Sequence, residues 1–177
     1  SSGFLYQNQN LIKTYRDQVI SYLDKTNIPV IKIDTPPIIK APPSASTARP
    51  NRPQVQNWTG PQFWEEISSK RREAALHPIP IDPLLCTLSA IRLAEIQRLG
   101  RLDDHEGFDP LIKKYQEDLR KSELSNLFEF LTSGAPSAKE AVNGLYNTLG
   151  HKSLFTEIYK AGCAYAAGTF GVVITSK

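Results

Sequence analysis

The chain has 177 residues, of which 40% are hydrophobic and 22% charged, and this composition excludes a disordered chain. The net charge of +3, from 21 basic and 18 acidic side chains, is too balanced to indicate a nucleic-acid partner. No apolar run approaches the roughly 20 residues that a membrane helix needs.

Residues 1–56 are predicted to form an arm before the main domain. Within residues 5–25, apolar residues recur at helical spacing, at Leu11, Tyr15, Val19 and Tyr22. This spacing predicts a helix whose apolar stripe needs a partner, which is the main domain, a second copy of the chain or a membrane anchor upstream. Eight prolines between Pro29 and Pro61 then predict an extended linker. Methionine is absent, so we expect that Ser1 is not the natural start.

Residues 57–177 are predicted to form one α+β domain with a small antiparallel sheet. Apolar spacing predicts helices over residues 63–76, 82–100, 109–120 and 137–150. Short apolar runs predict strands over residues 126–131, 155–165 and 169–175, the last two joined by a turn at Ala167 and Gly168. Because the helices mostly precede the strands, a layered α+β arrangement is favoured.

Capping residues set the expected helix starts. Asp82 and Asp109 each precede a proline, which places an aspartate at the N-cap and a proline at the first helical position. Ser137 and Glu140 have the spacing of a capping box. Gly100 is expected to end the second helix.

Two of the three histidines are candidate site residues. His105 and His151 each follow a predicted helix end, whereas His77 lies between a helix end and a proline and is interpreted as a surface residue. Histidines at the ends of separate helices can converge, and imidazole is a common metal ligand and general base. The alternative interpretation is that both rings are solvated.

Glu129 lies inside a predicted strand, on the same face as Leu127 and Leu131. A carboxylate in that position is costly unless it is paired or reaches water. Two interpretations are open. Either the strand is an edge strand with Glu129 in solvent, or Glu129 pairs with a partner such as one of the two histidines.

The acidic residues around His105 and the two cysteines are each given a structural interpretation. Asp103, Asp104, Glu106 and Asp109 are interpreted as a solvated loop in which Asp109 caps a helix. Cys86 lies on a predicted helix and Cys163 in a predicted strand. Buried free thiols are the favoured interpretation, and a helix-to-sheet disulfide is the alternative.

Seven segments of residues 63–174 together resemble the CAP superfamily (cysteine-rich secretory proteins, antigen 5, pathogenesis-related 1) in its short, cysteine-poor bacterial form. These segments are, in order, Ile67 to Arg71, Leu76 to Asp82, Ala94-Glu95 with Gly100, His105 to Asp109, Phe128 to Gly134, Ser137 to Val142, and Gly150-His151 with Phe155 to Ile158 and Gly162. The chain departs from the family pattern at Asp104, Phe130 and Leu149, where the family usually has Ser, Asn and Pro.

The resemblance implies an α/β/α sandwich with a cleft that holds two histidines and two acidic residues. Carried over, these are His105, Asp109, Glu129 and His151, with Glu106 as a rival to Asp109. In several family members this cluster binds a divalent metal such as zinc, for which His105 and His151 are the expected ligands. The family is secreted or held at the cell surface, and its clefts have been linked to sterol, lipid and peptide binding.

We therefore expect an exported or surface-tethered CAP domain, extracellular or associated with the cell envelope. Its cleft is expected to bind a metal, a small apolar ligand or a peptide. The alternative is a metal-dependent or histidine-based hydrolase acting on peptide or cell-wall bonds, although the sequence shows no obvious nucleophile. A third hypothesis is an interaction module that self-associates through residues 5–25.

Overall fold

The computed structural model describes residues 58–177. The predicted arm, with its helix over residues 5–25 and its proline-rich linker, lies outside these residues. In chain order the described elements are α2 (Gly60–Glu73), α3 (Pro83–Leu99), α4 (Phe108–Lys114), α5 (Gln116–Lys121), β1 (Leu127–Thr132), α6 (Ala138–Asn147), the 3-10 helix η1 (Lys152–Phe155), β2 (Ala161–Ala167) and β3 (Phe170–Ser176).

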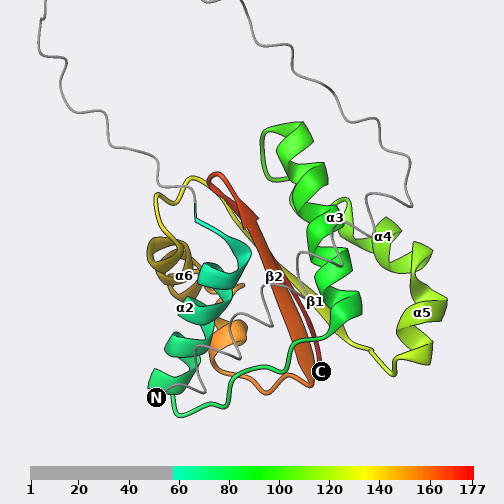
Figure 1. Ribbon diagram of the computed structural model, residues 1–177, viewed down its shortest axis with the longest axis horizontal. Coiled ribbons are helices and arrows are strands. Elements are labelled where there is room, and N and C mark those ends of the chain that lie inside the picture. Colours follow the sequence, from blue (N-terminus) through cyan, green and yellow to red (C-terminus); the bar gives the residue numbers. More distant parts are fainter. Residues whose placement is uncertain (1–57) are drawn as a thin grey trace, which may run out of the picture. The chain divides into compact units, whose positions relative to one another are not determined.

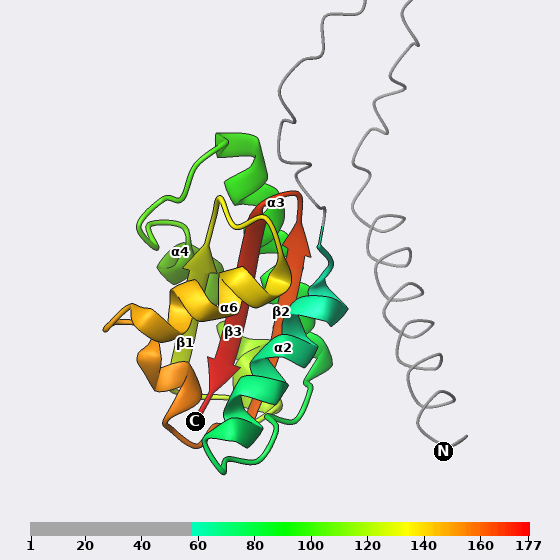
Figure 2. The same cartoon turned by 90° about the vertical axis from the view of Figure 1, so that its left-hand side faces the viewer.

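The three strands form one antiparallel sheet in the order β1-β3-β2, so β3 is central. Helices α2 and α6 cover one face of the sheet, and α3 lies on the other face with α4 and α5 beyond it (Figure 1). The view in Figure 2 shows α2 and α6 side by side in front of the sheet. The predicted α+β class with a small antiparallel sheet is thereby confirmed. No helix within residues 58–177 is long and apolar enough to cross a membrane.

Strand β3 has a core on both of its faces. Val173 packs with Phe130 in the cluster under α2 and α6. Val172 and Ile174 point to the opposite face, because successive side chains of a strand alternate, and all three β3 residues are fully buried. The α3 side is filled by leucines and isoleucines that include Leu85, Leu88 and Ile96. The sheet is therefore held between two helical layers.

The helix starts follow the capping chemistry. The Asp82 side chain accepts hydrogen bonds from the amides of Leu84 and Leu85 at 2.8 and 3.1 Å, and Gly100 ends α3 with a φ of 69°. The start of α2, however, lies three residues before the predicted one. Thr59 and Gln62 form a capping box there, which the sequence analysis missed. Helix α2 also ends earlier than predicted, at Glu73.

The predicted helix over residues 109–120 is instead two short helices, α4 and α5, that meet at Tyr115. Asp109 is not the N-cap. That position belongs to Gly107, and Asp109 lies in the first turn of α4. Ser137 caps α6 as predicted, by accepting from the Glu140 amide at 3.2 Å. Helix α6 ends at Asn147 rather than at Gly150.

The predicted strand over residues 155–165 is wrong in its first half. Residues 152–155 form η1, and β2 begins at Ala161, where it pairs with Ser176. The amides of Thr156 and Glu157 both donate to the Ser153 carbonyl, at 3.1 and 3.0 Å, so they form a turn instead of pairing with a strand, and the Glu157 carbonyl accepts from the buried guanidinium of Arg71. The hairpin between β2 and β3 pairs Ala167 with Phe170, close to the predicted turn.

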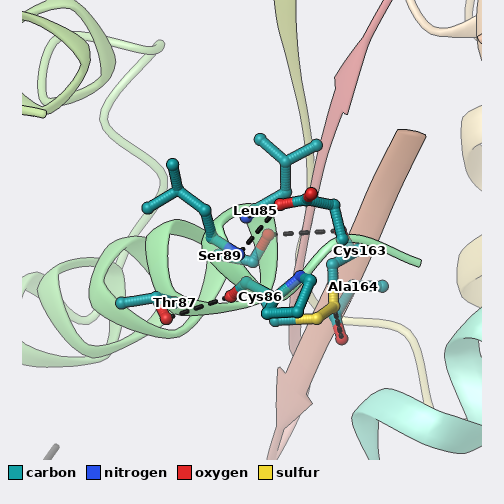
Figure 3. Close-up of a disulfide and its surroundings, with 9 residues drawn as sticks. Leu85, Cys86, Thr87, Ser89, Cys163 and Ala164 are labelled. Carbon is teal, nitrogen blue, oxygen red and sulfur yellow. Dashed lines mark hydrogen bonds between the residues drawn. A yellow bond between two sulfur atoms is a disulfide. The ribbon is translucent and has the colours of Figure 1, made fainter. Parts of the chain in front are cut away.

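Cys86 of α3 and Cys163 of β2 form a disulfide (Figure 3), with their Cα atoms 4.9 Å apart. The favoured interpretation of two free thiols is therefore wrong, and the alternative holds. Ser89, one helical turn after Cys86, donates a hydrogen bond from its hydroxyl to the Cys163 carbonyl at 3.1 Å. The bridge joins positions 77 residues apart, and in the chain-entropy picture a loop of this length stabilises the fold by about 4 kcal/mol.

Candidate functional site

Glu129 lies in β1 with its side chain 1% exposed. Its Oε1 atom accepts a hydrogen bond from the Arg92 Nε atom at 2.6 Å. Its Oε2 atom accepts one from the Nδ1 atom of His105 at 2.8 Å. Glu129 is therefore paired. The interpretation in which it points to water is wrong, and the interpretation in which it pairs with a histidine is confirmed.

Arg92 is the residue that the sequence analysis missed. It lies on α3, is 0% exposed and faces three carboxylates. Besides Glu129, its Nη2 atom donates to both oxygens of Asp103 at 2.8 and 2.9 Å, and its Nη1 atom donates to Glu95 at 2.7 Å. A signal was present in the sequence. Position 92 comes seven residues after Leu85 and four after Leu88, which is the buried register of the helix.

The loop from Asp103 to Gly107 places the side chain of His105 next to that of Glu129. Asp103 is 5% exposed, so it is not part of a solvated loop as predicted. It holds the loop at both ends, because its carboxylate binds Arg92 and also accepts from the Gly107 amide at 3.0 Å. Between these anchors, Asp104 and His105 have φ values of 50° and 70°. Left-handed backbone costs about 1–2 kcal/mol per residue outside glycine, and the Asp103 contacts offset that cost.

His151 approaches from the opposite helical layer, in the turn between α6 and η1. Its ring centroid lies 6.3 Å from that of His105 and 6.0 Å from that of Phe130. Glu129 and Phe130 are neighbours in β1 and point to opposite faces of the sheet. The two imidazoles therefore meet beside β1, an edge strand of the sheet. We call His105, Glu129 and His151 the two-histidine site.

Asp109 and Glu106 lie apart from this site. Asp109 is exposed on α4 and lines a separate hollow of about 610 Å³ with Phe108, Ile112 and Leu127. Glu106 is exposed in the loop after His105. The second buried acid is Asp103, which reaches His105 only through Arg92 and Glu129. The structure thus brings together three of the four residues carried over from the family pattern.

The carboxylates around Arg92 outnumber its single positive charge. Burial disfavours the guanidinium charge, but the hydrogen bonds that Arg92 donates to Glu129, Asp103 and Glu95 outweigh it and raise the pKa of Arg92 above its usual range. The hydrogen bond from Arg92 in turn lowers the pKa of the Asp103 carboxyl. One guanidinium therefore faces three carboxylates, and the cluster is negatively charged before His105 is counted.

The hydrogen bond to Glu129 selects one form of the His105 ring. A carboxylate only accepts hydrogen bonds, so the Nδ1 atom of His105 carries the proton and the Nε2 atom keeps a lone pair in the neutral ring. Burial, and then the nearby His105, lowers the pKa of His151, which favours its neutral form. In their neutral forms, two imidazoles side by side can bind a metal ion or accept a proton.

A donor set of two imidazoles is smaller than most metal sites use. Within residues 58–177, no three His, Cys, Asp or Glu side chains are grouped so that they could hold a metal ion together. A catalytic zinc usually has three protein ligands and a water. His105 does have the carboxylate partner that metal-binding histidines commonly have on their other ring nitrogen. The site therefore presents two imidazole rings, one of them oriented by a carboxylate.

A second buried arginine, Arg71 of α2, is 2% exposed. Its Nε atom donates to the His77 carbonyl at 3.1 Å, and its Nη1 atom donates to the carbonyls of Leu154 and Glu157, the latter at 3.0 Å. Burial lowers the pKa of Arg71. Arg71 therefore fixes the segment that follows His151.

Comparisons with known proteins bear on the fold. No family model and no curated protein matches the chain. Among solved structures, the chain is similar to an outer surface protein from Borrelia burgdorferi, with 22% sequence identity and a TM-score of 0.54. The match covers 65% of this chain and 89% of that protein. At this identity the likeness establishes a shared fold.

Proposed function

We propose that this chain is a CAP-type binding domain exposed at the cell surface, and that its two-histidine site binds a divalent metal such as zinc. A small apolar ligand or a peptide is proposed as a further ligand of the domain, as the family resemblance implies. The observation that carries the proposal is the pair of adjacent imidazoles, 6.3 Å apart, one of which is oriented by a buried carboxylate.

Two observations support a surface location. The structural neighbour is named an outer surface protein. The disulfide between Cys86 and Cys163 is a bond that persists mainly in oxidising compartments outside the cytosol. The resemblance of the seven sequence segments to the CAP superfamily points the same way.

In the proposed metal site, His105 and His151 are the ligands and Glu129 orients His105. A bound zinc ion supplies Lewis acidity, with coordination positions left for water or a ligand. The negative charge of the three carboxylates around Arg92 favours a cation in the neighbourhood. Asp109 is not needed as a ligand in this form of the proposal.

A hydrolase acting on peptide or cell-wall bonds is the second candidate function. The hydrogen bond between His105 and Glu129 favours it, because a carboxylate that holds a histidine in one tautomer prepares the other ring nitrogen to accept a proton. In that case the His105 Nε2 atom is the general base that activates a water molecule. Loss of peptide or cell-wall hydrolysis in His105→Gln is the expected result for this candidate.

Calorimetric titration of zinc into the full chain tests the main proposal. We expect saturable binding at one site in the micromolar range or tighter, lost in the double variant His105→Ala/His151→Ala. The matched control is His77→Ala, which removes the third histidine from an exposed loop position. Absence of zinc binding in the full chain, or binding that survives the double variant, would overturn the metal site.

A further inference from the structure

Two buried arginines lie on opposite sides of the sheet. Arg71 belongs to α2 and Arg92 to α3, and these helices cover opposite faces of the sheet (Figure 1). Their exposed fractions are 2% and 0%. Full burial of an arginine is rare and costly unless all its donors are satisfied. One terminal nitrogen of each arginine binds a segment that carries one histidine of the two-histidine site.

Arg92 contacts His105 indirectly in two ways, through the Glu129 side chain and through Asp103 in the same loop. Its Nε atom binds Glu129, which accepts from His105, and its Nη2 atom binds Asp103, two residues before His105. The planar guanidinium reaches both carboxylates at once with fixed geometry, which a lysine ammonium cannot reproduce. The loop backbone and the ring of His105 are therefore tied to the same side chain.

Arg71, by contrast, binds backbone carbonyls in the segment that follows His151. Its Nη1 atom binds the carbonyls of Leu154 and Glu157. Leu154 in turn donates its amide to the His151 carbonyl at 3.1 Å, because His151 is the N-cap residue of η1. The position of His151 relative to the sheet is therefore coupled to the Arg71 guanidinium through one turn of 3-10 helix.

We propose that Arg92 and Arg71 are the positioning residues of the two-histidine site, one for each ring. Arg92 fixes His105 through Glu129, and Arg71 fixes His151 through the η1 carbonyls. The two helical layers then each control one imidazole, and the distance between the rings depends on how both layers sit on the sheet. That this positioning serves metal binding rests on the proposed function. That each arginine sets the position of one histidine ring does not.

Side-chain NMR of the zinc-free full chain tests the coupling directly. The histidine ring signals are recorded by long-range ¹H–¹⁵N correlation and assigned with single His→Gln variants. We expect Arg92→Lys to shift the His105 ring signals while those of His151 stay in place, and Arg71→Lys to do the reverse. An arginine with a purely structural role predicts no such selectivity.

Matched controls come from the same helices. Arg98→Lys on α3 and Arg72→Lys on α2 change exposed arginines and should leave both rings unshifted. In zinc titrations, each buried variant is expected to bind about tenfold more weakly or worse, as for other residues that orient metal ligands. The exposed variants should bind as the unmodified chain does.

The outcomes separate the inference from the proposed function. Selective ring shifts in a chain that binds no zinc support the positioning role and remove the metal function. Zinc binding without selective shifts keeps the metal function and overturns the positioning role. If Arg92→Lys does not fold, Asp103→Asn loosens the same guanidinium, and Arg71→Gln replaces Arg71→Lys in the same way. Failure of both variants of one pair to fold also overturns the role, since that arginine would then be needed for the fold as a whole.

Discussion

The Nε atom of Arg92 lies 2.6 Å from the Oε1 atom of Glu129, in a position where both side chains are almost fully buried. This ion pair joins α3 to the edge strand β1. The carboxylate also holds His105, so one contact connects the core of the domain to the candidate site.

Removal of the Glu129 carboxylate should strongly lower the free energy of unfolding. In Glu129→Ala, the buried Arg92 loses its closest partner, and breaking a buried pair from one side costs about 3–5 kcal/mol. Urea unfolding measures this difference in the free energy of unfolding. Glu123→Ala is the control, because the Glu123 side chain is 86% exposed and an exposed pair contributes about 1 kcal/mol or less. Equal midpoints for the two variants would show that the ion pair contributes little.

The Asp103 contact with Arg92 should appear as a loss of stability in acid. Because the pKa of Asp103 is lowered in the folded state, the unfolded chain binds more protons as the pH falls below the ordinary value of 3.8. Stability from this group is therefore complete above that value and is lost as the pH falls through the folded-state pKa. Asp103→Asn should remove this part of the pH dependence. Urea midpoints measured between about pH 2 and 6 give the comparison, and parallel curves for both proteins would contradict the expectation.

Gly107 has no room for a side chain. A Cβ atom at this position would lie 2.1 Å from Arg92 Nη1 and 3.0 Å from Asp103 Oδ2. Arg92 cannot move aside without breaking its buried hydrogen bonds, so Gly107→Ala should destabilise the domain by about 1–3 kcal/mol. The control is Gly144→Ala in α6, where nothing lies within 4 Å of the added carbon and a gain of about 0.5–1 kcal/mol is expected. Thermal unfolding of both variants measures whether stability falls in Gly107→Ala and rises in Gly144→Ala. An unchanged stability of Gly107→Ala would mean that Arg92 is less constrained than its contacts indicate.

The disulfide should account for a large part of the stability. Replacing both cysteines, in Cys86→Ala/Cys163→Ala, should lower the free energy of unfolding by about 4 kcal/mol because the unfolded chain regains its freedom. A thiol assay on the denatured, unreduced protein should detect no free thiol from these residues. Detection of two thiols would show that the bond does not form under the conditions of preparation.

Much of the fold follows from local chemistry in the sequence. Asp82 and Ser137 cap their helices because a short oxygen side chain satisfies backbone amides at a helix start wherever the helix packs. The strand at Leu127–Thr132 follows from its run of apolar and aromatic residues. His105, Glu129 and His151 were identified from the sequence and lie together, but their selection relied on a family resemblance as well as on residue patterns.

The tertiary structure decided how distant residues pair. Arg92 occupies a helix position that the spacing reserves for an apolar side chain, and only the presence of Asp103 and Glu129 opposite it makes its burial tolerable. Cys86 and Cys163 lie 77 residues apart, and no local pattern shows that their Cα atoms come within 4.9 Å. The sequence by itself determined the capped starts of α3 and α6, at Asp82 and Ser137, and which side chains are chemically capable. Which of those side chains meet depends on how the helical layers pack on the sheet, because contacts between residues far apart in the chain form only when the core does.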